Sequence, residues 1–299
     1  MHGILLVDKP AGLTSAGVVR EVKRRLGGAK VGHLGTLDPF ATGLLPLAIG
    51  EGAKVVPFLN QEEKSYSGTI ALGNATDTLD STGRTTETAP VPPLTQATVD
   101  EIAGRFLGEI AQVPPAFSAL KRGGVPLYRL ARRGVELEVE PRRVSIASLS
   151  LALIGPQSLS LSVRCSKGTY VRSLARDLAL ALGTVGHLSA LRRTAFGMFR
   201  VSEAVPLESV LGAGDLPVLS PRQALGRMRE LQASEGLARE IRAGRQGALA
   251  SLEPAEAAEE VAKVVGPDGE LVAVVGVRLG AWKILRVFTV TADRGLDRM

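Results

Sequence analysis

Glycine and proline recur throughout residues 31–60, although the Gly43–Val56 part of this stretch is strongly apolar. Glycine permits backbone conformations that other residues avoid, and proline interrupts regular helices. Residues 31–60 therefore cannot form one continuous helix. We expect a buried loop that leads into a strand or a short helix.

The spacing of apolar residues predicts the elements on either side of this stretch. A basic amphipathic helix is expected over residues 14–30, ended by Gly27-Gly28, with its apolar face formed by Ala16, Val19, Val22 and Leu26. The other expected elements are a first strand at the N-terminus, a strand over 64–73, a loop over 74–95, a helix over 96–107, a helix-containing excursion over 116–143, an antiparallel pair over 144–153 and 158–166, and a helix over 169–182.

The character of the sequence changes after about residue 215, where Leu216-Pro217 and Ser220-Pro221 have the composition of a linker. A helix near 234–243 is followed by short strands with a hairpin turn at Pro267-Asp268-Gly269, and residues 271–277 and 282–290 complete a small β unit. The predicted fold class is α+β. Residues 1–215 would form a mixed, mainly antiparallel sheet with flanking helices, and residues 222–292 a small β-rich domain.

Composition restricts the chemistry of the chain. Cys165 is its only cysteine, so no intrachain disulfide can form, and with three histidines a zinc site is not expected. No apolar run is long enough for a membrane span and the N-terminus lacks a basic leader, so we expect a cytoplasmic protein. The net charge is +6, and arginines cluster in residues 121–143 and 164–200. Clustered arginine favours a phosphate-bearing partner, but charge alone cannot distinguish RNA, DNA and a nucleotide.

Asp38 is the first candidate for a reactive group. It lies between Gly35 and Gly43, is followed directly by Pro39, and stands close to His33. A proline restricts the preceding residue to extended conformations, so the carboxylate would be held in place as a nucleophile or base. An ordinary Asp-Pro turn explains the same residues and, taken alone, is the better interpretation.

Two further segments carry candidate residues. Arg172 would lie one turn inside the helix that follows Ser166-Lys167-Gly168, where it could pair with a carboxylate and lower its pKa; an exposed arginine near a helix cap is the alternative. Alternation places Lys64 and Tyr66 on one face of a strand, where the tyrosine could stack on a base. Each tyrosine, Tyr66 or Tyr170, is in isolation more typical of a core position.

Taken together and in order, these segments resemble the TruB family of tRNA pseudouridine-55 synthases over roughly residues 3–200. The matching motifs are Lys9-Pro10-x-Gly12-x-Thr14-Ser15, Gly32-His33-x-Gly35-x-Leu37-Asp38-Pro39-x-Ala41-x-Gly43, Lys64-x-Tyr66, Asp77-Thr78-x-Asp80-x-x-Gly83, Ser118-Ala119-Leu120-Lys121, Leu127-Tyr128-x-x-Ala131-Arg132-x-Gly134, Ser166-Lys167-Gly168-Thr169-Tyr170-x-Arg172 and Leu191-Arg192-Arg193. The sequence departs from the family pattern at Phe117 and at Asn74-Ala75, which affects fine substrate contacts.

The resemblance implies conversion of uridine to pseudouridine in the T loop of tRNA, at position 55, without a cofactor or metal. It implies a catalytic domain over 1–215, with an RNA-contacting excursion over about 113–143, and a PUA-like RNA-binding domain over 222–292. The T arm of tRNA would be the partner of a monomer that needs no protein partner and no membrane.

The resemblance also assigns roles to residues. Asp38 would be the catalytic nucleophile or base, attacking C1′ or removing the C2′ proton, and Arg172 its ion-pair partner. The other implied substrate-binding residues are His33, Tyr66, Tyr170 and Leu191, with Lys64, Lys167 and Arg193 as second-rank candidates.

Three other functions fit parts of the pattern. A non-catalytic RNA-binding or RNA-folding protein could share the scaffold, but binding alone needs no buried carboxylate. A guide-RNA-dependent relative that modifies ribosomal RNA would be expected to carry a longer, lysine-rich tail. An aspartate-dependent glycoside hydrolase would need a second carboxylate, which the Asp38 loop lacks.

Overall fold

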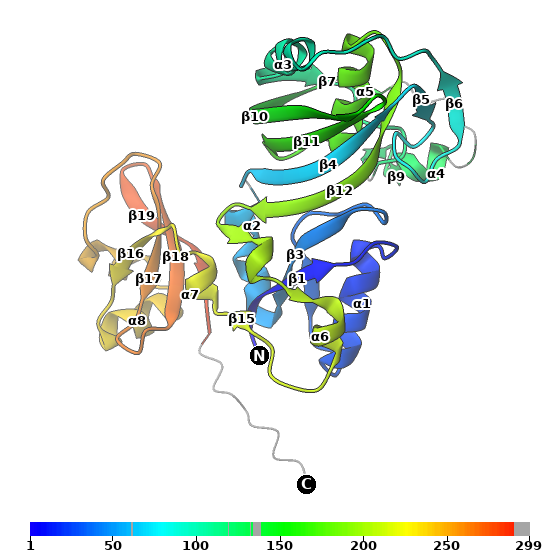
Figure 1. Ribbon diagram of the computed structural model, residues 1–299. Coiled ribbons are helices and arrows are strands. Elements are labelled where there is room, and N and C mark those ends of the chain that lie inside the picture. Colours follow the sequence, from blue (N-terminus) through cyan, green and yellow to red (C-terminus); the bar gives the residue numbers. More distant parts are fainter. Residues whose placement is uncertain (61, 119, 132, 134–138, 290–299) are drawn as a thin grey trace.

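The computed structural model describes residues 1–60, 62–118, 120–131, 133 and 139–289 and contains two principal sheets (Figure 1). The large sheet has 11 strands, with the path β14-β1-β3-β12-β4-β11-β10-β7. The strands of this path are β1 (Gly3–Lys9), β3 (Thr42–Ile49), β4 (Lys64–Leu72), β7 (Gly108–Gln112), β10 (Arg142–Gly155), β11 (Ser158–Cys165), β12 (Gly186–Phe196) and β14 (Val205–Pro206). Most pairings are antiparallel, but β1 with β14 and β3 with β12 are parallel. The expected mixed, mainly antiparallel sheet is confirmed.

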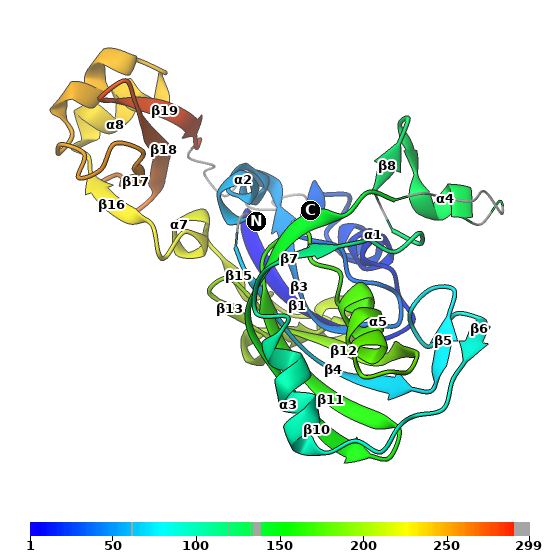
Figure 2. The ribbon, with the colours of Figure 1, turned by 90° about the horizontal axis from the view of Figure 1, so that it is seen from above.

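Helices α1 (Ser15–Arg25), α3 (Gln96–Gly104) and α5 (Val171–Ala181) pack on the large sheet, and α1 and α5 lie on the same side of it (Figure 2). Thr14 caps α1 by accepting from the Gly17 N–H, and Thr95 caps α3 in the same way through Thr98. The predicted apolar face of α1 is confirmed at three of its four positions, because Val22 is buried and Val19 and Leu26 pack partly buried on the core. Ala16 is exposed, and Val18, which was not part of the predicted face, is buried.

The stretch 31–60 contains the expected loop and short elements: β2 (Val31–His33), then residues 34–41, then β3, the 3₁₀ turn η1 (Gly50–Lys54) and α2 (Val56–Leu59). Gly43 adopts φ +98° where β3 passes β12, and a Cβ there would lie 2.4 Å from the Arg193 carbonyl oxygen. The close approach of these two strands therefore depends on glycine.

The structure contains three features that the sequence did not predict. Residues 74–95 are not all loop, because β5 (Asn74–Thr76) pairs with β6 (Thr85–Thr88). No strand was expected over 186–196, yet β12 lies at the centre of the large sheet. The proposed linker is ordered: β15 (Val218–Leu219) pairs with β1, and Ser220 caps α7 (Pro221–Ala224).

The second sheet has four strands in sequence order: β16 (Arg229–Gln232), β17 (Val261–Val265), β18 (Leu271–Arg278) and β19 (Ala281–Val287). With α8 (Glu235–Arg242) it forms the expected C-terminal β-rich unit, and β17 and β18 are joined by the expected turn at residues 267–269. Leu271 and Phe288 pack with Ile4 and Phe196 in one apolar cluster, so this unit rests against the large sheet.

Some expectations fall outside the described residues. These are residues 119, 132 and 134–138 of the excursion and residues 290–292 of the expected second domain. The described part of the excursion contains β8 (Lys121–Arg122), β9 (Val125–Pro126) and α4 (Leu127–Ala131), which project from the body of the molecule (Figure 2). No helix in the described part of the chain is long and apolar enough to cross a membrane.

Candidate active site

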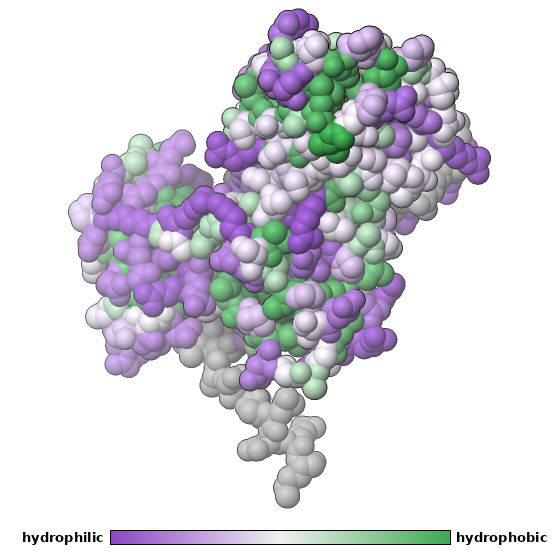
Figure 3. Space-filling view, viewed as in Figure 1, coloured by the Kyte–Doolittle hydropathy of each residue, from purple (hydrophilic) through white to green (hydrophobic). Residues whose placement is uncertain are grey.

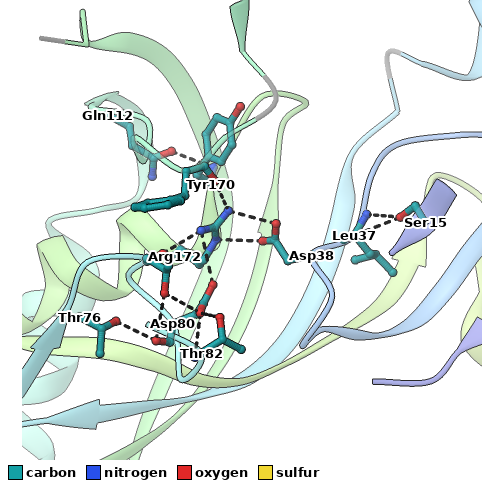
Figure 4. A network of polar contacts seen from close by, with 11 residues as sticks. Ser15, Leu37, Asp38, Thr76, Asp80, Thr82, Gln112, Tyr170 and Arg172 are labelled. Atoms are coloured by element: carbon teal, nitrogen blue, oxygen red, sulfur yellow. Dashed lines mark hydrogen bonds and ion pairs between the residues drawn. The ribbon is translucent and has the colours of Figure 1, made fainter. Parts of the chain in front are cut away.

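Asp38 lies in the loop between β2 and β3, and the residue before it is held by helix α1. The buried Ser15 hydroxyl accepts from the Leu37 N–H at 2.8 Å and lies 3.1 Å from the Leu37 carbonyl oxygen, to which it donates (Figure 4). After Asp38, the Pro39 carbonyl oxygen accepts from the Gly12 N–H and from the Lys9 ammonium. The loop is thus fixed on both sides of the carboxylate by the segment that leads into α1.

Lys9 is fully buried, and its ammonium donates to the carbonyl oxygens of Pro10, Leu13 and Pro39. Burial lowers the pKa of Lys9 to about 8, and the negative charge of Asp38 opposes that shift. Lys9 thereby joins β1, the turn before α1 and the loop that carries Asp38.

Replacing Ser15 by alanine is expected to reduce the rate of the catalysed step more than substrate affinity. The change leaves the Leu37 N–H without its partner inside the protein, which costs about 1–3 kcal/mol of stability and loosens the position of Asp38. Single-turnover rates and denaturant unfolding test this. A Ser15→Ala protein with an unchanged rate would show that the hydroxyl does not position Asp38.

The guanidinium of Arg172 faces Asp38 from the first turn of α5 (Figure 4). Arg172 Nε lies 2.9 Å from Asp38 Oδ2, and Nη2 donates to Asp38 Oδ1 at 3.0 Å. Nη1 and Nη2 also donate to the carbonyl oxygens of Thr78 and Phe117, at 2.7 and 3.0 Å. Two parallel N–H···O contacts fix both the position and the plane of a carboxylate. The expected Asp38–Arg172 ion pair is therefore formed.

A second carboxylate, that of Asp80, contacts the same guanidinium. Asp80 Oδ2 lies 3.4 Å from Arg172 Nη1, and Oδ1 accepts from the hydroxyls of Thr78 and Thr82 and from the Thr82 N–H. Leu79, directly before Asp80, has φ 61°, a conformation rare for leucine. The motif that contains Asp80 matches the family pattern, but the sequence alone does not indicate what this residue does.

Burial has the largest effect on the pKa of Asp38, and Arg172 opposes it by lowering that pKa, as expected. Burial raises the pKa of Asp38, the charge of Asp80 raises it further, and the opposing effects of Arg172 and Lys9 do not outweigh burial. Arg172 therefore limits a shift that burial imposes. A group with a raised pKa loses its negative charge at a higher pH than an exposed aspartate would.

Replacing Asp80 by asparagine is expected to move the acid limb of the pH–rate profile to lower pH. The substitution removes a negative charge that raises the pKa of Asp38, so Asp38 remains ionised at lower pH. The plateau rate should fall, because Arg172 loses one of its partners. Single-turnover rates across the acid range measure both effects. If the acid limb of the Asp80→Asn profile moved to higher pH, Asp80 would not be raising the pKa of Asp38.

Aromatic and apolar residues lie around this ion pair. The half-buried Tyr170 directly precedes α5, its N–H donates to Gln112 Oε1, and the charges of Asp38 and Arg172 both act on its hydroxyl. Tyr66 on β4 and Leu191 on β12 are buried in one apolar cluster with Leu37. The structure thus brings Tyr66, Tyr170 and Leu191 towards the Asp38–Arg172 pair from three separate elements.

The remaining candidates lie on the other flank of the Asp38 loop. Arg193 is fully buried and donates to the carbonyl oxygens of Leu44 and Gly35. Lys64 lies beside it, and Lys167 is exposed in the turn after β11. The buried His33 Nδ1 atom has no hydrogen-bond partner among the residues that the structure describes, and burial together with the charge of Arg193 lowers the His33 pKa. Among the described residues, the Asp38 carboxylate forms its ion pair with Arg172 rather than with any of these four side chains.

Comparison with known families decides what this site belongs to. The family model described as TruB family pseudouridylate synthase, N-terminal domain, matches residues 23–171, and that of the tRNA pseudouridylate synthase B C-terminal domain matches residues 172–216. A tRNA pseudouridine synthase B from Geobacter sulfurreducens is 44% identical over 249 residues, which is 82% of this chain and 82% of that protein. The chain belongs to the TruB family. It is an isomerase of the pseudouridine synthase class.

A further relative, tRNA pseudouridine synthase B of Azoarcus sp. strain BH72, is 49% identical over 70% of each chain. Among solved structures, a Cbf5-Nop10-Gar1 complex contains a chain with a TM-score of 0.73 and 23% identity, covering 96% of this chain and 85% of that one. The similarity to that structure establishes the fold, but it carries no information about substrate or partners.

Sequence reasoning missed the residues that hold the site together: Lys9, Ser15, Thr78, Asp80, Thr82 and Gln112. Four of these residues belong to motifs that carry the family resemblance: Lys9, Ser15, Thr78 and Asp80. The sequence therefore pointed to their positions but did not indicate what they do. Within the described part of the chain, no group of three or more His, Cys, Asp or Glu residues is arranged to hold a metal ion.

Proposed function

We propose that this TruB family protein isomerises uridine to pseudouridine in the T loop of tRNA, at position 55, with Asp38 as the reacting carboxylate. The observation that carries the proposal is the two-point contact between Asp38 and Arg172, at 2.9 and 3.0 Å. Relatives at 44–49% identity that bear the name tRNA pseudouridine synthase B support tRNA as the substrate.

The reaction requires an ionised carboxylate in a confined site. The N1–C1′ bond of the nucleotide breaks, the uracil turns, C5 bonds to C1′, and the C5 proton is lost while N1 becomes protonated. Asp38 would either attack C1′, forming an ester bond that breaks when C5 bonds to C1′, or remove the C2′ proton and return it to C2′ when C5 bonds to C1′. Arg172 would keep Asp38 charged and oriented, because it limits the rise in its pKa and contacts both of its oxygens.

The surroundings suit an extruded nucleotide. A uridine in a folded loop must leave its stack to reach Asp38, which costs a few kcal/mol, and stacking on an aromatic ring offsets this cost. Tyr66 would be the stacking ring, while Leu191 and Tyr170 would line the uracil site. An open groove of about 690 Å³, whose lining includes Pro39, Phe40, Thr82 and Leu191, would admit the RNA beside the Asp38 loop.

RNA beyond the target would contact two other parts. The excursion, with Lys121 and Arg129, would close over the T arm. The C-terminal unit would act as a PUA-like RNA-binding domain, and the face of it seen in Figure 3 is largely hydrophilic. We also propose that the chain acts alone, as a monomer, without a protein partner.

Incubation of the purified chain alone with an unmodified tRNA transcript tests the proposal. Pseudouridine should form at one site, and a transcript in which the T-loop uridine is replaced by cytidine should yield none. Activity that requires a guide RNA or partner proteins would favour the guide-dependent alternative. Tight RNA binding without any product would favour a non-catalytic protein.

A further inference from the structure

Three basic side chains gather at one end of the large sheet, beside the Asp38 loop. Lys64 begins β4, and in the strand register it stands opposite Cys165 on β11 and Phe196 on β12. Lys167 follows two residues after Cys165, and Arg193 precedes Phe196 on the bulged strand β12. We call Lys64, Lys167 and Arg193 the basic cluster.

Arg193 is the member that most needs an explanation. Its side chain is fully buried, its Nε and Nη2 atoms donate to carbonyl oxygens, and within the described residues Nη1 has no hydrogen-bond partner. The neutral Tyr66 hydroxyl is the polar side chain that acts on its charge. Removing a guanidinium from water is costly unless an anion accompanies it. No salt bridge of Arg193 with an acidic side chain is found in the described residues.

Lys64 adds a second charge next to the first. Its ammonium lies 4.8 Å from the centre of the Phe196 ring, and the Arg193 guanidinium carbon lies 5.8 Å from the same ring. The stem of Lys64 packs on Gly35 in the Asp38 loop: a Cβ built on Gly35 would lie 3.5 Å from Lys64 Cε. Burial lowers the pKa of Lys64, and the positive charges of Arg193 and Lys167 lower it further.

The protein supplies little negative charge to balance the basic cluster. Glu62 and Glu63, the nearest acids in sequence, contact Arg227 and Arg164 at 3.8 and 3.7 Å. Burial raises the pKa of Cys165 to about 11 and also raises the pKa of Tyr66, so both side chains are neutral at physiological pH. An excess of positive charge therefore remains beside the loop that carries Asp38.

We propose that the basic cluster binds a backbone phosphate of the substrate RNA next to the target nucleotide. Lys64 and the exposed Lys167 would contact the phosphate. The buried Arg193 would attract the phosphate electrostatically without contacting it, and would hold the Gly35 carbonyl group in place. The bound phosphate would then fix the position of the adjoining ribose relative to Asp38. This follows because the cluster contacts Gly35, and Gly35 and Asp38 belong to one loop. This inference rests on the proposed function, which supplies the RNA.

The salt dependence of RNA binding tests this phosphate site. Binding of an unmodified tRNA transcript is measured in the Asp38→Asn background, where no turnover is expected. Removing one cation that neutralises a phosphate should reduce the slope of log K against log salt by about 0.7–0.9. Lys64→Met and Lys167→Met should each produce this reduction, and Lys64→Arg should restore the slope. Arg105→Met, at the exposed C-terminal end of α3, removes one charge elsewhere and should leave the slope unchanged.

A second measurement locates the phosphate. Single methylphosphonates, which are uncharged, are placed on either side of the target uridine in a T-arm hairpin. One position should weaken binding by the same factor as Lys167→Met, and combining the two changes should weaken it no further. The inference is overturned if, at every methylphosphonate position, the loss of affinity adds to the loss caused by Lys167→Met. It is also overturned if the salt slopes of Lys64→Met and Lys167→Met equal the slope of the Asp38→Asn protein.

The phosphate site and the proposed function can fail independently of each other. Turnover of unmodified tRNA by the wild-type chain is measured in parallel. If pseudouridine forms but the slopes do not change, the phosphate site is wrong and the function stands. If the slopes change but wild-type protein forms no pseudouridine in tRNA, the proposed function is wrong and the anion site stands.

Discussion

The Asp38→Asn protein is expected to be folded and to form pseudouridine at least roughly 10⁴-fold more slowly than the wild type, as in other enzymes that lose a reacting group. The amide keeps the size of the side chain but can neither attack C1′ nor accept a proton. The fold should survive because Arg172 retains Asp80 and the carbonyl oxygens of Thr78 and Phe117.

Single-turnover product formation measures the loss of rate, and thermal unfolding measures whether the Asp38→Asn protein is folded. Asp77→Asn is the matched control, because Asp77 is an exposed aspartate in the same loop as Asp80 and its Oδ1 only accepts from the Arg84 N–H. An amide oxygen can replace that acceptor, so Asp77→Asn should be nearly as active as wild type. A rate for Asp38→Asn within tenfold of wild type would remove Asp38 from the mechanism.

Replacing Arg172 by methionine should damage both stability and activity. The side chain is only 5% exposed and contacts two carboxylates, so its loss leaves Asp38 and Asp80 facing each other without a cation. Breaking a buried ion pair in this way costs about 3–5 kcal/mol. The pKa of Asp38 should rise further, which would leave less of the carboxylate ionised at neutral pH.

Denaturant unfolding and pH–rate profiles test the Arg172 prediction. Arg172→Lys keeps the charge but cannot contact both Asp38 oxygens with a planar fork, so it should be more stable than Arg172→Met and still impaired in rate. Arg176→Met, one turn further along α5, is the control and should behave like wild type. Equal stability of Arg172→Met and wild type would show that the two carboxylates do not depend on this guanidinium.

The sequence predicted elements whose periodicity is local. Alternating residues indicated β10 and β11, and helical spacing with a glycine stop indicated α5, because these patterns report burial on one face. β12 was missed because two register irregularities interrupt its alternation and it carries adjacent arginines. β5 and β6 were missed because Thr- and Asp-rich residues are typical of loops.

The site was predicted less completely than the fold. Motifs in order pointed to Asp38 and Arg172, but nothing local distinguishes Arg192 from Arg193. In the structure Arg192 forms a two-point ion pair with Asp8, at 3.0 and 2.6 Å, while Arg193 is buried among carbonyl groups. The roles of Ser15 and Asp80, and the sign of the Asp38 pKa shift, depend on contacts between distant segments and on burial.

The most direct test of Asp38 as the reacting group is to map pseudouridine at single-nucleotide resolution in an unmodified tRNA transcript after incubation with the purified wild-type chain or with Asp38→Asn. We predict one modified position, the T-loop uridine, with the wild-type chain, and none with the variant. Modification only at other positions, or the same modified position with Asp38→Asn, would contradict this mechanism.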